Sequence, residues 1–129
     1  MGKYSKKGWE RRKKLREGYS EFFMKHVASI NNGRCCCAEC GTRLKGHVSE
    51  IAHILPKGAF PSVATNDDNV IYLCGMYSER QCHTNFDNRG LDYIRNMNIF
   101  PHAAKQFTLL IPYISEQISY KILEKYGES

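Results

Sequence analysis

The first part of the chain carries apolar residues at the period of an amphipathic helix. They recur every three or four residues, at Leu15, Tyr19, Phe22, Phe23, Val27 and Ile30. This spacing places them on one helix face that can be buried against a core. The triplet Asn31-Asn32-Gly33 follows, and both residue types tolerate the left-handed backbone conformation that ends many helices. We therefore predict a long N-terminal helix that ends at this triplet.

Two short apolar runs in the middle of the chain predict strands. Residues 48–55 contain Val48, Ile51 and Ile54 and are followed by Pro56, and residues 70–73 have the sequence Val-Ile-Tyr-Leu. Runs of this length that are bounded by proline, glycine and polar loops are typical of strands. The polar loop 57–69 separates them. A short helix is expected over residues 83–88, before Gly90.

The C-terminal region again has helical spacing. Its apolar positions are Ile111, Ile114, Ile118 and Ile122, so we expect a C-terminal helix in which Pro112 lies in the first turn. The apolar face of this helix would pack on the core or bind a partner.

The length and composition favour a single small globular unit. The chain has 129 residues, of which 42% are hydrophobic, so it can form one modest core but not two. We divide it into a basic arm with the N-terminal helix (1–34), a central unit (35–92) and a helical extension (93–129). No apolar run approaches the roughly 20 residues that span a bilayer. The basic N-terminus lacks the apolar stretch of a signal peptide. A cytoplasmic protein without membrane partners is therefore expected.

The positive charge is concentrated in an N-terminal arm. Residues 1–16 contain eight basic residues and one acidic residue, Glu10, so they carry +7, and the other 113 residues, with 11 basic and 12 acidic, carry −1 of the total +6. The basic residues are Lys3, Lys6, Lys7, Arg11, Arg12, Lys13, Lys14 and Arg16. A basic arm on a near-neutral body suits binding to the phosphates of DNA. A solvated helix start with lysines for solubility is the equal alternative.

Six cysteines indicate a metal site. Four of them, Cys35, Cys36, Cys37 and Cys40, lie within six positions, and Cys74 and Cys82 follow later. Such crowding suits a metal-binding turn better than disulfides, which also form poorly in the cytosol. We expect a structural zinc on Cys37, Cys40, Cys74 and Cys82, because four sulfur ligands leave no open position for water. Cys35 or Cys36 could replace one of them. Buried free cysteines are the alternative.

A second cluster combines histidine, amide and carboxylate side chains. His53 lies at the end of the first strand, Asn69 precedes the second strand, and His83 and Asp87 are four residues apart. On a helix, residues four apart share one face, where a histidine and a carboxylate can bind a divalent ion with open positions for water. Alone, each residue is equally compatible with a structural histidine or a surface ion pair.

The order of these residues resembles the HNH endonuclease motif. The matching segments are Glu50-Ile51-Ala52-His53-Ile54-Leu55-Pro56, Asn69-Val70-Ile71-Tyr72-Leu73-Cys74 and Cys82-His83-Thr84-Asn85-Phe86-Asp87-Asn88-Arg89-Gly90. They are similar to the branch written A-H-I-x-P, N-x-x-x-L and H-x-x-F-D-x-x-G. The resemblance covers about residues 35–90. It implies an α+β fold with a ββα-metal core, a zinc site formed by four cysteines, and flanking helices.

The resemblance also implies roles for individual residues. His53 would be the general base, Asn69 would orient it or hold the loop, and His83 and Asp87 would bind one catalytic ion such as Mg²⁺, Mn²⁺, Ni²⁺ or Zn²⁺. The expected reaction is hydrolysis of DNA to a 5′ phosphate and a 3′ hydroxyl. An imidazole suits this task because its pKa lies near neutrality. By analogy, a small nuclease with a basic arm is typical of phages, bacteria or mobile elements.

One position departs from the family pattern. Many members have a metal-binding aspartate directly before the base histidine, and this chain has Ala52. In an extended strand Glu50 points to the same side as Ala52, so Glu50 is a candidate replacement ligand. Asn85 and Asn88 are weaker candidates.

The other histidines have simpler expected roles. His47 would be a loop residue or a spare ligand, and we expect His26 to pack on the helix face and His102 to be structural.

Two other functions remain open alternatives. One is a non-catalytic zinc module that binds nucleic acid through a degenerate nuclease site. The other is an assembly protein that uses the isoleucine-rich tail as a partner helix. A nuclease that cuts both DNA strands would usually need two sites, in a homodimer or a larger nucleoprotein assembly, or two successive visits of one site.

Overall fold

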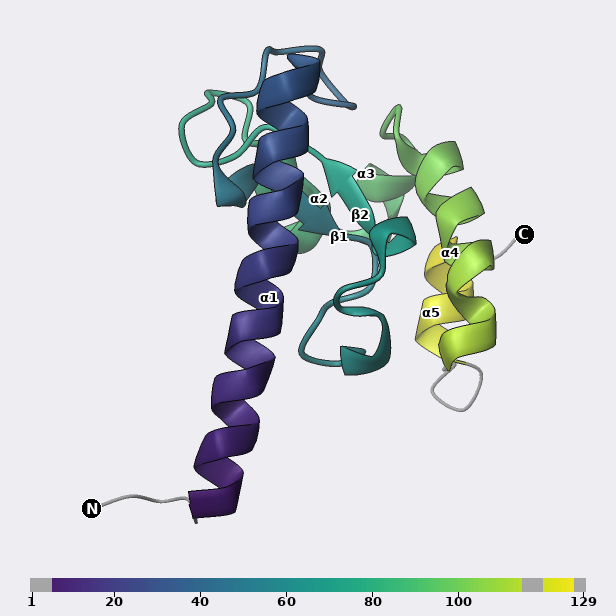
Figure 1. The fold of residues 1–129 in the computed structure, drawn as a ribbon. Helices are drawn as coiled ribbons and strands as arrows, with labels where there is room; N and C mark the ends of the chain where they lie inside the picture. The colour runs from purple at the N-terminus through teal and green to yellow at the C-terminus, as the bar shows by residue number, and fades with distance from the viewer. Residues whose placement is uncertain (1–5, 115–119, 127–129) are drawn as a thin grey trace.

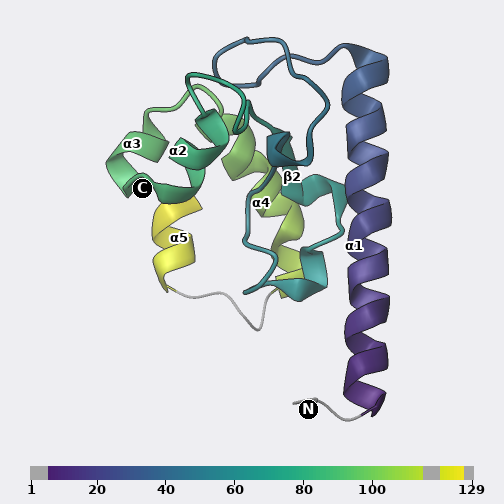
Figure 2. The same cartoon turned by 90° about the vertical axis from the view of Figure 1, so that its left-hand side faces the viewer.

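The longest element of the protein is an N-terminal helix. The computed structural model describes the backbone of residues 6–114 and 120–126, and the side chains of residues 19–114 and 122–126. Helix α1 runs without interruption over Lys6–Gly33 and is therefore about 42 Å long at 1.5 Å per residue. Its C-terminal half packs on the body, and its N-terminal half extends past it (Figures 1 and 2). The predicted helix end is confirmed at Gly33, and Arg34 takes the left-handed conformation, with φ of 49°.

The centre of the fold is a small antiparallel sheet. Strand β1 (Ile51–His53) pairs with β2 (Val70–Tyr72), with His53 opposite Val70. The two strands were both predicted, but the first is shorter than expected because Val48–Glu50 forms a 3-10 turn. In that turn the His47 ring accepts a hydrogen bond from the Ser49 amide, and Glu50 reaches back to the His47 amide.

Short helices follow the sheet. They are α2 (Cys82–Asn88), α3 (Leu91–Arg95), α4 (Phe100–Ile114) and α5 (Tyr120–Tyr126). In Figure 1 the two strands lie between α1 and the α4–α5 pair. The core contains side chains from all these layers, including Phe22 of α1, Ile71 of β2, Phe86 of α2 and Phe107 of α4. The protein is thus a mixed α+β fold with a two-stranded sheet.

The predicted C-terminal helix is wrong in its boundaries. Helix α4 begins at Phe100 and ends at Ile114, so Pro112 lies in its last turn and not in the first turn of a later helix. The buried face of α4 is Ala103, Phe107, Leu110 and Ile114, at spacings of three and four. Ile118 lies outside the described residues, and Ile122 belongs to α5. Among the helices that the structure describes, none is both long and apolar enough for a membrane span.

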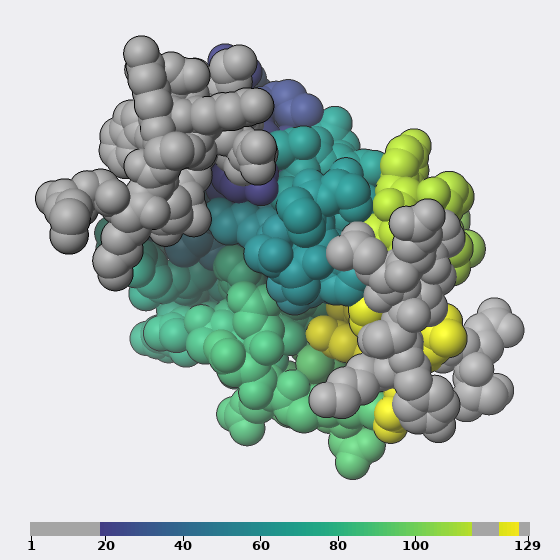
Figure 3. Space-filling model, turned by 90° about the horizontal axis from the view of Figure 1, so that it is seen from below, coloured from purple at the N-terminus to yellow at the C-terminus, as the bar shows by residue number. Residues whose placement is uncertain are grey.

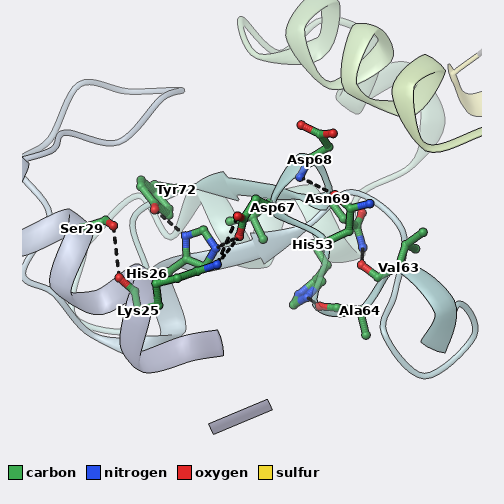
Figure 4. A network of polar contacts seen from close by, with 12 residues as sticks. Lys25, His26, Ser29, His53, Val63, Ala64, Asp67, Asp68, Asn69 and Tyr72 are labelled. Carbon is green, nitrogen blue, oxygen red and sulfur yellow. Dashed lines mark hydrogen bonds and ion pairs between the residues drawn. The ribbon is translucent and has the colours of Figure 1, made fainter. Parts of the chain in front are cut away.

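A polar network fixes α1 to the sheet (Figure 4). The two ring nitrogens of the buried His26 contact the Tyr72 hydroxyl at 2.6 Å and the Asp67 carboxylate at 2.9 Å. Lys25 Nζ also binds Asp67, at 2.9 Å. This hydrogen bond from Lys25, together with the one from His26, lowers the pKa of Asp67 although partial burial opposes the shift. The network sets the direction in which α1 leaves the body.

Candidate functional site

Four cysteines from three separate segments meet in one cluster. The Sγ atoms of Cys37, Cys40, Cys74 and Cys82 all lie within 4.8 Å of one another. Cys37 and Cys40 belong to the turn after α1, Cys74 follows β2, and Cys82 begins α2. The four residues are therefore positioned to bind a metal ion, as predicted. Cys35 and Cys36 are not part of this cluster, since Cys35 Sγ contacts the Ser29 carbonyl and Cys36 is exposed.

Backbone hydrogen bonds shape the cysteine turn and direct amide donors at two of the sulfur atoms. The Cys37 amide donates to the Thr42 carbonyl at 2.7 Å, and Gly41, with φ of +79°, allows the tight reversal between them. The Cys40 amide donates to Cys37 Sγ at 3.5 Å, and the Cys82 amide donates to Cys74 Sγ at 3.3 Å. Amide donors that point at sulfur stabilise thiolates, the form that binds metal.

The thiols of the cluster have different acidities. Burial raises the pKa of Cys37 and of Cys82. Partial burial also acts to raise the pKa of Cys40, but hydrogen bonding to Thr42 outweighs it and lowers the value to about 6. Several thiolates in so small a volume repel one another, so full deprotonation of the cluster requires a bound cation.

The second cluster begins with His53 at the end of β1. Its Nε2 lies 2.8 Å from the carbonyl oxygen of Ala64. A carbonyl only accepts, so Nε2 carries the proton and Nδ1 retains its lone pair. Burial is the main cause that lowers the pKa of His53, and the positive charge of Lys57 acts in the same direction. The neutral ring therefore persists at neutral pH and can accept a proton at Nδ1.

Asn69 holds the loop that contacts His53. Its side chain is fully buried, accepts from the Leu55 amide at 2.8 Å, and donates to the carbonyls of Leu55 and Val63 at 3.0 and 3.2 Å (Figure 4). Leu55 lies two residues after His53, and Val63 directly precedes Ala64. Of the two roles expected for Asn69, the contacts are those of a loop-holding residue, which positions both partners of the His53–Ala64 hydrogen bond.

His83 and Asp87 lie on one face of α2, as their spacing predicted. His83 Nε2 is 3.0 Å from Asp87 Oδ2, and His83 Nδ1 donates to the Ser49 carbonyl at 2.5 Å. Burial acts to lower the pKa of His83, but the hydrogen bonds to Asp87 and Ser49 outweigh it and raise the value. With Nδ1 bonded, a neutral His83 would place two acceptor atoms 3.0 Å apart. That pair requires a proton or a cation between them.

His53, His83 and Asp87 line one open cleft with a volume of about 740 Å³. In the view from below, the loop after β1, the α2–α3 segment and α5 meet on one face of the molecule (Figure 3). Lys57 and Lys125 also line the cleft, and neither was predicted as a site residue. No sequence pattern marks Lys125, because only the packing of α5 brings it close to α2.

The structure gives Glu50 a different role from the predicted one. Its side chain is only 4% exposed, and its carboxylate accepts hydrogen bonds from the amides of Lys45, Gly46 and His47 at 2.7–3.1 Å. Glu50 does not line the cleft of His53 and His83. Ala52 is fully buried in the core. Glu50 is therefore not placed beside His53 and His83 as the replacement ligand that the sequence suggested.

The weaker candidates also have other partners. The side-chain amides of Asn85 and Asn88 donate to the carbonyls of Arg80 and Thr84. The His47 ring contacts Ser49, and His102 is exposed on α4. The candidate DNA-binding residues from Lys6 to Arg16 lie on the N-terminal half of α1, and their side chains are outside the described part of the chain.

Comparisons with protein-family models, curated proteins and solved structures find no match to this chain.

Proposed function

We propose that this protein is a metal-dependent HNH endonuclease that hydrolyses phosphodiester bonds of DNA. The observation that carries the proposal is the pairing, in one cleft, of a histidine with a defined neutral tautomer and a histidine–carboxylate pair on a helix. These groups supply a base and a divalent-ion site, which are the two requirements for activating water against a phosphodiester. They also occur in the order of the HNH motif.

The base in this mechanism is Nδ1 of His53. It takes a proton from a water molecule, and the resulting hydroxide attacks phosphorus while the bond to the 3′ oxygen breaks. The leaving 3′ oxygen takes a proton from solvent, and His53 later returns its own proton to solvent. The products are a 5′ phosphate and a 3′ hydroxyl. The Ala64 carbonyl fixes the ring tautomer, and Asn69 holds this carbonyl in place through the loop. His53 thus starts the reaction in the correct protonation state at neutral pH.

The residues that would hold the catalytic ion are His83 and Asp87. The Ser49 carbonyl accepts from Nδ1 of His83, so Nε2 is left as the ligand atom beside Asp87 Oδ2. Two protein ligands leave room for water and phosphate oxygens. A divalent ion bound there would neutralise charge on the phosphate and on the departing oxygen.

The cysteine cluster would hold a structural zinc ion. Four sulfur ligands leave no position for a reacting water, so this ion would act on the fold and not on the substrate. Cys82 begins α2, and the next residue is His83. A zinc ion at the cluster would therefore fix the helix that carries the catalytic ligands.

The basic N-terminal half of α1 would bind the phosphates of the DNA backbone. The seven residues Lys6, Lys7, Arg11, Arg12, Lys13, Lys14 and Arg16 lie on one continuous helix that extends past the body. Nonspecific phosphate contacts by such a segment weaken steeply with salt. The anchoring of α1 through His26 and Asp67 gives the arm a defined direction.

The test is cleavage of supercoiled plasmid by the wild type and by His53→Ala. We expect nicking that requires a divalent ion and stops in EDTA. In His53→Ala it should fall by at least about 100-fold, because a general base contributes on that scale. His102→Ala, which replaces an exposed histidine outside the cleft, is the matched control. Wild-type activity in His53→Ala, with unchanged fold and metal content, would contradict the proposal.

A second candidate function is a non-catalytic zinc module that binds nucleic acid. Ala52 favours it, because a buried alanine stands where many family members have a metal ligand. The same plasmid assay separates the two functions. Salt-sensitive DNA binding without nicking in Mg²⁺, Mn²⁺ or Ni²⁺ would favour the module.

A further inference from the structure

A lysine from the C-terminal helix lines the cleft of the candidate nuclease site. Lys125 lies on α5 and borders the same cleft as His53, His83 and Asp87. Its Nζ lies over the ring of Phe86 at 5.2 Å and over the ring of Tyr126 at 5.1 Å. The apolar wall of the cleft therefore carries one half-buried ammonium group.

The position of Lys125 is set by its neighbour. Tyr126 is buried, donates from its hydroxyl to the Ile54 carbonyl at 2.9 Å, and stacks on Phe107 with ring centroids 5.2 Å apart. Ile54 is the residue after His53. The Arg95 guanidinium donates to the carbonyl of Glu124, the residue before Lys125. These contacts hold the last turn of α5 next to His53, and they thereby fix the position of Lys125.

Within the described part of the chain, Lys125 has no carboxylate within ion-pair distance. Burial lowers its pKa, and the more distant charge of Asp87 opposes this effect only in part. The aromatic rings offset some of the lost hydration. An ammonium group in this position is suited to an anion that enters the cleft from outside.

Lys57 provides a useful comparison. It also borders the cleft, but its side chain is exposed and its Nζ lies over the rings of Phe23 and Tyr19 of α1, at 4.9 and 5.4 Å. Lys57 therefore lies on the side of the cleft that faces α1. Lys125 is on the side of α2, which carries the candidate metal ligands.

We propose that Lys125 is a catalytic residue that binds a non-bridging oxygen of the DNA phosphate held in this cleft. This inference rests on the proposed nuclease function. A positive charge fixed beside the reacting phosphate stabilises the charge that develops in the transition state, in addition to the stabilisation by the divalent ion. The residue lies outside the HNH motif and comes from a helix that the motif does not include.

The experiment compares Lys125→Met, Lys125→Arg and Lys105→Met with the wild-type full chain. Methionine keeps the length of the side chain and removes the charge, arginine keeps the charge, and Lys105 is an exposed control on α4. Plasmid nicking is measured in Mg²⁺. Binding of a fluorescent duplex oligonucleotide is measured without added divalent ion, and without chelator, over a range of salt concentrations. We expect Lys125→Met to lose about 100-fold in nicking. The slope of log affinity against log salt should fall by about 0.9, the value for one phosphate contact.

A footprint on the wild-type protein makes the test independent of folding in the variants. Lysines are acetylated with and without the oligonucleotide, and the rates at Lys125 and Lys105 are read by mass spectrometry. Protection of Lys125 but not of Lys105 supports the proposal. Equal rates at Lys125 in the two conditions overturn it, as does a Lys125→Met protein that nicks and binds like the Lys105→Met control.

The two proposals fail in different ways. Suppose that the wild-type protein binds DNA without nicking it and that Lys125→Met loses one phosphate contact. This result overturns the nuclease function and keeps Lys125 as an anion-binding residue. A wild type that nicks DNA in a His53-dependent manner, with full activity in Lys125→Met, overturns the role of Lys125 alone. A wild type that neither nicks nor binds overturns both.

Discussion

The cysteine cluster and the histidine cleft are two sites built on the same helix with opposite properties. Cys82 and His83 are consecutive residues of α2, and they belong to different sites. The cysteine site has four ligand atoms within 4.8 Å of one another and is largely buried. The cleft has two candidate ligand atoms, His83 Nε2 and Asp87 Oδ2, and is open to solvent. The first arrangement suits a structural ion and the second suits a reacting one.

The difference lies in what surrounds each ligand. In the cysteine cluster, the closed site, backbone amides point at the sulfur atoms and three chain segments meet. In the histidine cleft, the open site, backbone carbonyls fix the histidine rings instead. The Ala64 carbonyl binds His53, and the Ser49 carbonyl binds His83. Each carbonyl selects one tautomer and leaves one nitrogen for chemistry. Cys82 and His83 are consecutive residues of α2, yet their side chains belong to these two different surroundings.

The largest expected effect comes from breaking the closed site. Cys74→Ser removes one of four sulfur ligands at a buried position, so the protein should lose its bound metal and more than about 4 kcal/mol of unfolding free energy. Metal content by mass spectrometry and thermal unfolding measure this. Cys36→Ser, an exposed cysteine outside the cluster, should retain both properties. An unchanged metal content in Cys74→Ser would show that the cluster is not the metal site.

A smaller effect is expected from removing the residue that supports the open site. Asn69→Ala leaves the Leu55 amide and the carbonyls of Leu55 and Val63 without their side-chain partner, at a cost of about 2–4 kcal/mol. Urea unfolding measures this loss, with the exposed Asn88→Ala as control. We also expect lower nicking at temperatures where the variant is folded, since the Ala64 carbonyl is no longer held. A fully active and stable Asn69→Ala protein would remove Asn69 from the account.

The smallest expected effect is on the pH dependence of the cleft. Burial lowers the pKa of His53 below its ordinary 6.5, and the base must be neutral to accept a proton. Nicking at saturating metal should therefore be constant above that pKa and fall about tenfold per pH unit below it. Lys57→Met removes a positive charge that lowers the pKa of His53, so it should move the acid limb to higher pH. An acid limb above pH 6.5 in the wild type would contradict this assignment.

Local patterns in the sequence predicted the elements and the motif residues. The three-to-four spacing of apolar residues identified α1, and the two apolar runs identified β1 and β2. The four-residue interval between His83 and Asp87 correctly placed both on one helix face. Each of these features depends on neighbouring residues in the chain, which is why the sequence alone was sufficient.

Three features of the structure were not predicted. Glu50 was expected in an extended strand, but three backbone amides bind its carboxylate in a local turn. The C-terminal helix was expected to have Pro112 in its first turn, but α4 begins at Phe100, since its buried face already starts at Ala103. Lys125 reaches the cleft only because Tyr126 packs under Ile54. No spacing rule connects Lys125 to the cleft, whereas Glu50 lies at the three-residue spacing of a capping box with His47.

The most direct test of the division between the two sites is nicking as a function of added metal. The protein is first loaded with one zinc ion per chain, and weakly bound ions are removed. The account predicts no nicking by this form, full nicking after addition of Mg²⁺ or Mn²⁺, and a requirement for about 10- to 100-fold more added ion in Asp87→Asn but not in the exposed control Asp92→Asn. Nicking by the one-zinc form without added ion, or the same ion requirement in Asp87→Asn and the wild type, would contradict it.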